Sequence, residues 1–423
     1  MSFFDRPDPT TIFTPRGDYN PKMYAPRDEL EKDFGEKLRR NEHIVIYGDS
    51  GCGKSWLYRN FFSTNDVYFK IVNLADASRN RSIASELLRV VQIPGAAAPT
   101  GYDEKKTAQI GIPGTASGSL EHVDKYTFVT EDPLRSAIKE VRKSAGKRQA
   151  FIVLDNLERI FDKPALMEEL ADLITLADDP TFITEKVRFL IVGVPAGVRD
   201  FFNQTPSHRT VSNRLIELIE VSRLTEAEAR RIIQTGFKTQ LDYKIEPGFE
   251  SDLLNHILWV TDRIPQALHE FCLELAFVSE KDALVTRKGL ELADKKWLRG
   301  TLNSAYVVVE GQLNERDTKV QRRNQVLFVL GQILDNEFKV QRVESEIRKT
   351  FYNNDLSAQI GGVGNCLSEL TETRPSEGVK PVLRKTAKGD AFMFLDPQYR
   401  MCIRAMLRVA TTGKVEKIAI DQV

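Results

Sequence analysis

Eight consecutive residues, from Gly48 to Ser55, have the types and spacing of a phosphate-binding loop, Gly-x-x-x-x-Gly-Lys-Ser. Glycines let the backbone point several N–H groups at one phosphate, and the positive end of the following helix attracts the same anion. In such a loop the lysine reaches the β- and γ-phosphates and the hydroxyl binds Mg²⁺. We therefore expect Lys54 and Ser55 to hold a nucleoside triphosphate with Mg²⁺. The residues expected to line the nucleotide are Gly48, Asp49, Ser50, Gly51, Cys52, Gly53, Lys54, Ser55 and Trp56.

A second group of residues could complete the metal side of this site. An apolar run ends in Asp155, and a carboxylate at the end of a strand can hold Mg²⁺ directly or through water. The next residue is Asn156, where ATPases that hydrolyse quickly usually have a glutamate that polarises water. An amide cannot act as a general base. The nearest carboxylate, Glu158, could be brought to the site by a helical turn, or it could be a solvated helix residue.

The surrounding pattern predicts the elements that would position these side chains. Apolar runs that read as buried strands alternate with helical periodicity, which is typical of a parallel sheet covered on both sides. The strands are expected at 43–47, 67–72, 150–155 and 187–194, and the helices at 27–40, 56–62, 83–91, 133–144 and 165–177. We therefore expect an α/β fold, with a P-loop NTPase core of parallel αβα type over residues 23–222.

Two segments depart from this alternation. Residues 1–22 contain four prolines among polar residues and are expected to form an extended arm. Residues 94–125 are rich in glycine and proline, so they read as an insertion, either a flexible loop or a glycine-rich hairpin.

The second half of the chain has a different organisation. Residues 223–310 show helical periodicity, with helix starts marked by Thr225 and Pro265, and are expected to form a helical lid. Residues 311–423 are expected to form a winged-helix domain. Its helices are predicted at 326–334, 340–351, 356–371 and 398–409, with a β-hairpin of 382–385 and 391–395.

Composition narrows the class further. The 423 residues carry a formal net charge of zero, which argues against a protein that coats nucleic acid or anionic lipid by bulk charge. The four cysteines form no Cys-x-x-Cys pair, which suits a reducing cytosol better than a disulfide scaffold or a zinc site. No apolar run reaches the length of a membrane span and the first residues do not read as a signal peptide. We expect a cytoplasmic protein that does not contact a membrane.

Beyond these residues, the chain resembles the STAND and origin-recognition-like branch of the AAA+ ATPases over about residues 23–410. The stretch 23–30, Met-Tyr-Ala-Pro-Arg-Asp-Glu-Leu, is similar to the family motif of two apolar residues followed by Gly-Arg-Glu, with Pro26 in place of the glycine. In that family the arginine, here Arg27, lies near the nucleotide.

Two further motifs carry the resemblance. Arg214 lies in Asn-Arg-Leu, where relatives have an arginine finger for a neighbouring subunit; Arg209 competes for this role, and a structural arginine is the other interpretation. The stretch 262–268 is similar to the Gly-x-Pro-x-Ala-Leu of STAND proteins, whose proline contacts adenine. That residue is Pro265 here, and Arg263 stands where glycine is usual.

The resemblance implies a three-part AAA+ ATPase that binds ATP and Mg²⁺ between its core and its lid. Asn156, together with the absence of a polar side chain at 193–195, favours slow hydrolysis. The first hypothesis is a nucleotide-controlled switch that forms a homo-oligomer in the ATP state or controls a partner protein. The alternative is a DNA-binding ATPase similar to initiator or transposition-helper proteins, using cations on the wing such as Arg384, Lys385 and Lys388. A small-molecule kinase is disfavoured because no motif for a second substrate is present.

Overall fold

The computed structural model describes residues 6–17, 19–40, 42–91, 133–180, 184–193, 202, 209–314, 321–358, 360–374, 378–386, 388–418 and 420. The expected insertion at 94–125 lies outside these residues. The chain folds into two compact units. The first, which we call the P-loop unit, is Pro26–Ser222. The second combines Met1–Ala25 with Arg223–Val423, and we call it the helical unit.

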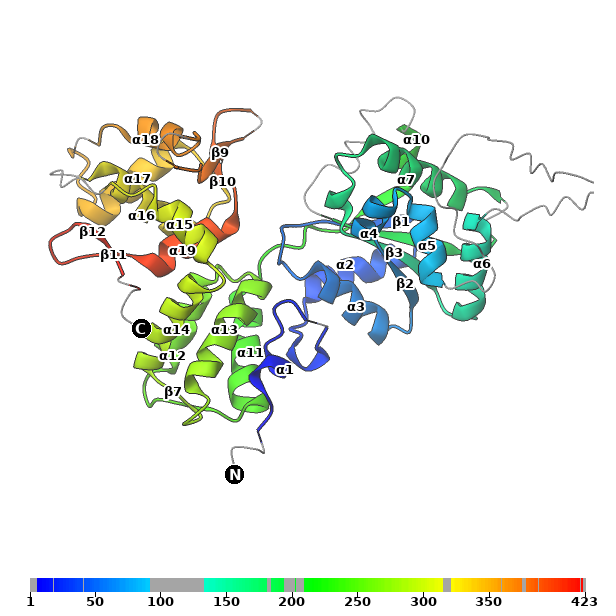
Figure 1. Ribbon diagram of the computed structural model, residues 1–423, viewed down its shortest axis with the longest axis horizontal. Helices are drawn as coiled ribbons and strands as arrows, with labels where there is room; N and C mark the ends of the chain where they lie inside the picture. The colour runs from blue at the N-terminus through cyan, green and yellow to red at the C-terminus, as the bar shows by residue number, and fades with distance from the viewer. Residues whose placement is uncertain are drawn as a thin grey trace, which may run out of the picture. The chain divides into compact units, whose positions relative to one another are not determined.

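The P-loop unit is built on a five-stranded parallel sheet, as the apolar runs predict (Figure 1). The strands are β1 (His43–Ile46), β2 (Tyr68–Asn73), β3 (Ala150–Asp155), β4 (Val187–Val192) and β5 (Leu215–Glu217). Their order is β2-β3-β4-β1-β5, and every neighbouring pair is parallel. The carboxyl ends of all five strands therefore meet at one edge of the sheet, and the amino ends meet at the opposite edge.

Helices cover both faces of this sheet because the strands are apolar on both sides. The helices are α2 (Asp28–Leu38), α3 (Lys54–Thr64), α4 (Leu74–Asn80), α5 (Ile83–Val91), α6 (Pro133–Ala145), α7 (Pro164–Ala177) and α10 (Arg209–Ser212). Ile44 and Ile46 pack in a core with α2 and α3. Val45, between them, faces the other core, which contains α4 to α7. This alternation confirms the predicted αβα sandwich.

The lid region of the helical unit is mainly α-helical, as expected. Its elements are α11 (Glu226–Gln234), the π-helix η4 (Thr235–Gln240), α12 (Glu250–Val260), α13 (Pro265–Ser279), α14 (Arg287–Arg299) and α15 (Asn303–Glu310). Thr225 and Glu228 form a capping box at the start of α11, and Pro265 is the first residue of α13. Both predicted helix starts are confirmed. Two short parallel strands, β6 (Lys244–Ile245) and β7 (Leu284–Val285), were not predicted.

The first 22 residues do not form an extended arm over their described part. They contain the helical turn α1 (Pro9–Ile12) and begin the 3₁₀ turn η1 (Pro21–Met23), so two of the prolines open helical turns. Phe13 is fully buried, with its ring centroid 5.1 Å from that of Phe237. Thr14 N donates to His269 Nδ1 at 3.1 Å. Burial lowers the pKa of His269 to about 4, so the ring is neutral and can accept this hydrogen bond.

The C-terminal module, which we define as residues 321–418, contains helices and a small antiparallel sheet. Its elements are α16 (Arg322–Gln332), β8 (Glu337–Phe338), α17 (Val340–Phe351), α18 (Val363–Glu369), β9 (Leu383–Lys385), β10 (Phe392–Phe394), α19 (Pro397–Met406), β11 (Leu407–Val409) and β12 (Val415–Lys417). The expected hairpin is present as β9–β10, and β8 joins it on the other side of β10.

Two predicted helices of this module are shorter than expected. The third begins only at Val363, because Gly362 takes a left-handed conformation with φ of 80° just before it. The last ends at Met406, because Leu407–Val409 pairs with Val415–Lys417 as a second hairpin. A residue with positive φ and a strand pairing both interrupt helical hydrogen bonding.

Among the described residues, no helix combines the length and the apolar character that crossing a bilayer requires. The four cysteines are free thiols, and Cys52 of the phosphate-binding loop is buried.

Candidate functional site

The phosphate-binding loop joins the carboxyl end of β1 to the start of α3, which places it at the carboxyl edge of the sheet. Gly48, Gly51 and Gly53 all have positive φ, at 148°, 78° and 86°. A Cβ atom on Gly48 would lie 2.2 Å from the carbonyl oxygen of Val221. The loop conformation therefore requires glycine both for its backbone angles and for the space beside Val221.

The ammonium group of Lys54 lies over this loop. Its Nζ donates to the carbonyl oxygens of Gly48 and Asp49 at 2.7 and 2.8 Å. Burial lowers the pKa of Lys54, although the nearby carboxylates of Glu158 and Asp155 act in the opposite direction. A poorly solvated ammonium is better compensated by an anion than by neutral carbonyl groups. The position of Lys54 therefore favours a phosphate group at the mouth of the loop.

Asp155, at the end of β3, is brought next to the start of α3. Its Oδ2 accepts hydrogen bonds from Ser55 Oγ at 3.3 Å and from the hydroxyl of Tyr58 at 3.1 Å. Its Oδ1 accepts from the backbone N–H of Asn156 at 2.9 Å. Hydroxyl and carboxylate oxygens are the ligands that Mg²⁺ prefers. The donor set of Ser55 and Asp155 therefore fits a single Mg²⁺ ion beside the loop.

Two residues of this arrangement were missed in the sequence. Tyr58 is fully buried on α3, and burial, with the charge of Asp155 adding to it, raises the pKa of its hydroxyl, so the group stays a hydrogen-bond donor. Asn73 ends β2 directly beside Asp155 in the sheet register. Its Oδ1 accepts from Asn156 Nδ2 at 2.9 Å. A signal for Tyr58 was available, because it lies one helical turn after Lys54.

Asn156, which follows Asp155, has an unusual backbone conformation. It takes a left-handed conformation with φ of 66°, which asparagine tolerates better than most residues. The 3₁₀ turn η2 (Leu157–Arg159) follows, and Glu158 is exposed on that turn. No side chain with the chemistry of a base therefore occupies the position after Asp155, and Glu158 lies close enough to influence Lys54 electrostatically.

Arg27 connects the loop to the end of the P-loop unit. Its guanidinium is buried, and it donates through Nη1 to the carbonyl of Cys52 at 3.0 Å and through Nη2 to the carbonyl of Ser222 at 2.7 Å. The structure therefore brings Arg27 to the loop itself. Of the other predicted loop residues, Cys52 is buried, Ser50 is exposed, and Asp49 and Trp56 are half-buried.

Arg214 lies at the opposite edge of the sheet. It directly precedes β5, its carbonyl accepts from the backbone N–H of His43 at 3.0 Å, and its Nε lies 3.0 Å from Asp178 Oδ2. The structure therefore does not bring Arg214 to the phosphate-binding loop of its own chain. Pro265 belongs to the helical unit, where it opens α13.

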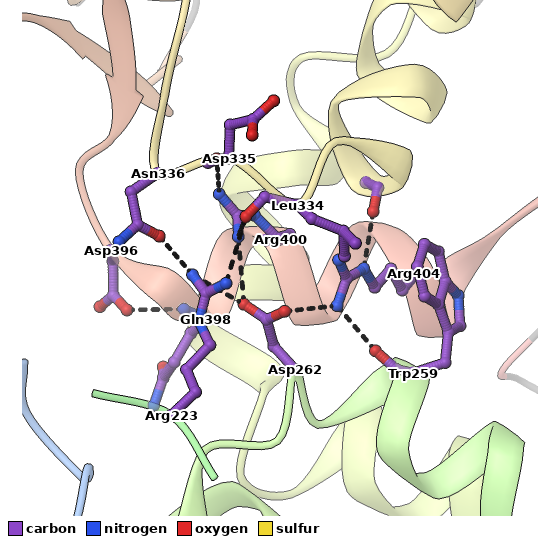
Figure 2. Close-up of polar contacts among 11 residues, drawn as sticks. Arg223, Trp259, Asp262, Leu334, Asp335, Asn336, Asp396, Gln398, Arg400 and Arg404 are labelled. Atoms are coloured by element: carbon purple, nitrogen blue, oxygen red, sulfur yellow. Dashed lines mark hydrogen bonds and ion pairs between the residues drawn. The ribbon is translucent and has the colours of Figure 1, made fainter. Parts of the chain in front are cut away.

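The buried carboxylate of Asp262 and three arginines, two of them buried, hold the segment before Pro265 (Figure 2). Oδ1 of Asp262 accepts from Arg404 Nη1 at 2.8 Å. Oδ2 accepts from Arg400 Nη1 at 3.2 Å and lies 3.1 Å from Arg223 Nη2. We call these four residues the Asp262 cluster. Burial lowers the pKa of Arg400 to about 10, so the guanidinium remains protonated at neutral pH.

The same arginines also bind main-chain carbonyl groups of the C-terminal module and of α12. Arg400 donates to Asp335 O at 2.7 Å and Arg404 to Gly331 O at 2.6 Å, as Figure 2 shows in part. Arg404 also donates to Trp259 O at 2.8 Å, and its guanidinium lies 3.9 Å from the centroid of the Trp259 ring. The cluster therefore fastens the end of α12 to the C-terminal module within the helical unit.

The backbone next to the cluster explains an unusual residue in the sequence. Asp262 and Arg263 have φ of 52° and 56°, a conformation that glycine adopts without strain. This is where Arg263 replaces the glycine of the similar motif. The carbonyl of Arg263 accepts from Leu224 N at 3.0 Å.

Comparison with known proteins supports the fold assigned to the P-loop unit. Residues 38–202 match the family model described as an AAA domain. A Walker-type ATPase of Pyrococcus abyssi is a similar solved structure, with 14% identity, a TM-score of 0.50 and coverage of 93% of this chain and 99% of that chain. The Aeropyrum pernix ORC2 protein, in ADPNP–ADP complexes, has 14% identity, a TM-score of 0.51 and coverage of 93% and 96%. No curated protein matches. The chain therefore has the fold of P-loop ATPases of the AAA type.

Proposed function

We propose that this protein is an ATP-binding, slowly hydrolysing AAA+ ATPase of the STAND or origin-recognition-like branch. We further propose that it acts as a nucleotide-controlled switch that governs assembly or a partner protein. The observation that carries the proposal is the convergence of Lys54, Ser55 and Asp155 at the carboxyl edge of the sheet, with an amide at the next position. The AAA-domain match over 38–202 supports the nucleotide assignment.

In this proposal each residue of the site has a defined task. Lys54 exchanges the carbonyl groups of Gly48 and Asp49 for phosphate oxygens. The backbone of the loop binds the phosphates with its N–H groups, and Ser55 and Asp155 would hold Mg²⁺. Bound Mg²⁺ supplies the charge that neutralises the phosphates during transfer.

Replacing Asp155 with alanine should abolish most Mg²⁺-dependent ATP hydrolysis while leaving much of the nucleotide affinity. The reason is that the loop and Lys54 bind phosphates without Asp155, whereas the metal loses a charged ligand. Turnover and ATP affinity should be measured on the same protein. Tyr58→Phe is the matched control, because it removes one hydrogen bond to Asp155 and keeps the carboxylate. Wild-type turnover in Asp155→Ala would assign the metal to another residue.

Slow turnover follows from Asn156, because an amide cannot accept the proton of an attacking water. We expect a rate well below the enzyme median of about 10 per second. Asn156→Glu should increase the turnover rate. Asn156→Asp should increase it too, because aspartate supplies a carboxylate and tolerates the left-handed backbone conformation at this position. The measurement is steady-state phosphate release. If the wild type turns over quickly and Glu158→Gln abolishes the activity, then Glu158 is the base and the slow-switch proposal is wrong.

The contacts of Arg27 and Arg223 support a route from the nucleotide to the helical unit. Arg27 touches both the loop carbonyl of Cys52 and the carbonyl of Ser222, the last residue of the P-loop unit. The next residue in the chain is Arg223, which belongs to the Asp262 cluster. Ser222 and Arg223 are consecutive in the chain, so we propose that a change in the loop on ATP binding is passed to the cluster along the backbone. Because the cluster fastens α12 to the C-terminal module, we propose that the lid and the C-terminal module move together when ATP binds.

We propose that Arg214 serves a neighbouring subunit as an arginine finger in an ATP-dependent homo-oligomer, and that Pro265 contacts adenine. A guanidinium at a neighbouring site would neutralise charge on the γ-phosphate.

We also propose that the C-terminal module is a winged helix that docks a protein. Several of its cations are paired with carboxylates: Lys339 lies 2.9 Å from Asp390, and Arg342 lies 2.8 Å from Glu346. Paired cations are less available for phosphates. These pairs support a protein partner, whereas Arg384, Lys385 and Lys388 of the wing are exposed and would be the contacts if the module binds DNA instead.

A further inference from the structure

A hollow of about 270 Å³ lies in the P-loop unit at the amino edge of the sheet. It is at the opposite edge from the phosphate-binding loop, because its residues precede or begin β1, β3 and β4. Nine residues line it, and seven of them are lysine or arginine; no lining residue is acidic. We call the seven cations the basic edge. They are Arg39, Arg40, Arg142, Lys147, Arg148, Lys186 and Arg188.

Three arginines of the basic edge are held in place by neutral groups. Arg142 donates through Nη2 to the carbonyl of Gly146 at 2.9 Å, and Arg148 donates through Nε to the carbonyl of Ala145 at 3.1 Å. Arg188 donates to the carbonyl of Leu38 at 3.0 Å. A carbonyl group fixes the direction of a guanidinium without cancelling its charge. These three guanidinium groups are therefore oriented but not neutralised by these contacts.

Carboxylates compensate little of this charge. Arg148 lies 3.7 Å from Asp66, whose side chain is 82% exposed, and such an exposed pair is weak. Within the described part of the chain, no carboxylate forms an ion pair with the other six cations. Nε of Arg142 is buried and has no hydrogen-bond partner among the described residues. Burial also lowers the pKa of Arg188, which reflects a guanidinium that is short of both water and counter-charge.

The positive charge of the basic edge is a local concentration, because the whole chain has a formal net charge of zero. Arginine recognises phosphate oxygens through paired N–H groups, and lysine adds point charge. The hollow is smaller than most small-molecule pockets, which measure about 300–1,000 Å³. It accommodates a phosphate group better than a whole nucleotide. The three adjacent strand ends extend over about 10 Å, so the cations can serve more than one phosphate of a chain.

We propose that the basic edge binds the phosphate backbone of a nucleic acid. This site is separate from the ATP site and from the wing of the C-terminal module, and it does not depend on the proposed switch. Binding of this kind depends on the charge of the phosphates and not on the base sequence. It provides the P-loop unit with its own contact to nucleic acid.

The test is fluorescence anisotropy of the full chain with labelled single-stranded and duplex oligonucleotides over a series of salt concentrations. The variant is Lys147→Gln combined with Lys186→Gln, since both side chains are exposed and neither anchors the fold. Lys385→Gln with Lys388→Gln is the matched control, which removes the same charge from the wing. We expect the edge variant to bind about tenfold more weakly, with a salt slope smaller by about two. The wing control should bind like the wild type.

Several outcomes would overturn the proposal. They are the absence of oligonucleotide binding, a loss confined to the wing control, and an edge variant that binds like the wild type. Calorimetry with inorganic pyrophosphate on Lys54→Ala protein separates a free anion from a nucleic acid, because that protein lacks the phosphate-binding lysine. Tight pyrophosphate binding that the edge variant loses, without oligonucleotide binding, would assign the basic edge to a free anion. Oligonucleotide binding that persists in Lys54→Ala would show that the basic edge acts independently of the ATP site.

Discussion

Replacement of Lys54 by alanine should reduce ATP binding below the level that can be measured. Lys54 is the only cation within the Gly48–Ser55 loop, and its ammonium lies over the loop at 2.7 and 2.8 Å from two of its carbonyl oxygens. Its partial burial, which lowers its pKa, also makes its interaction with a phosphate anion stronger than it would be in water. Alanine removes this charge-assisted contact with the β- and γ-phosphates. Isothermal titration calorimetry or a fluorescent ATP analogue would measure the effect.

The control for this prediction is a test of folding. Lys54 is not part of either hydrophobic core of the P-loop unit, so the thermal unfolding midpoint should change little. Lys54→Arg is a second comparison, because it keeps the charge but replaces the compact ammonium group with a larger, planar guanidinium group. We expect it to bind ATP more weakly than the wild type. An unchanged ATP affinity in folded Lys54→Ala protein would refute the phosphate-binding assignment.

Replacement of Asp262 by alanine should destabilise the helical unit by about 3–5 kcal/mol, the usual cost of leaving a buried charge without its partner. Asp262 is the carboxylate shared by Arg223, Arg400 and Arg404. The side chains of Arg400 and Arg404 are only 3% and 1% exposed, so water cannot replace the lost carboxylate. For a unit of this size, each kcal/mol shifts the unfolding midpoint by roughly 2–4 °C. Thermal unfolding followed by tryptophan fluorescence should therefore show a decrease of roughly 6–20 °C.

A matched substitution separates this effect from the loss of an ordinary ion pair. Asp252 lies 2.9 Å from Arg287 Nη1, and both side chains are more than half exposed, so Asp252→Ala should cost at most about 1 kcal/mol. Asp262→Asn should lie between the two, because it retains an acceptor oxygen and tolerates the positive φ. Equal shifts for Asp262→Ala and Asp252→Ala would show that the Asp262 cluster does not hold the helical unit together.

The sequence was sufficient to predict the parts of the molecule that depend on local pattern. The first strand and the strand ending in Asp155 were predictable because each is a short apolar run that leads into a glycine or ends in a carboxylate. The expectation that Arg27 lies near the nucleotide came from the family resemblance; the structure shows its guanidinium donating to the carbonyl of Cys52 in the loop. The helix start at Pro265 was predictable because proline fits the first turn of a helix.

Features that depend on tertiary contacts were not predictable. The members of the Asp262 cluster come from positions 223, 262, 400 and 404. Only Arg400 and Arg404 are related by helical spacing on α19, and nothing in the sequence relates that pair to Asp262 or Arg223. Asn73 reads as the end of a strand, and only the pairing of β2 with β3 places it beside Asp155. The helix predicted to run to Val409 ends at Met406, because pairing with Val415–Lys417 outweighs the helical pattern. The basic edge could have been noticed, since lysine or arginine precedes or begins three of the strands.

In the proposed switch, ATP binds at the phosphate-binding loop and is hydrolysed slowly enough for the ATP state to persist. The most direct measurement is to load the wild-type protein with labelled ATP and Mg²⁺, remove free nucleotide, and follow the ratio of bound ATP to bound ADP over time. We predict that most of the bound nucleotide is still ATP at the first time points and that Lys54→Ala retains none. Bound nucleotide that is already ADP at the first time point, or no retained nucleotide in the wild type, would contradict the claim.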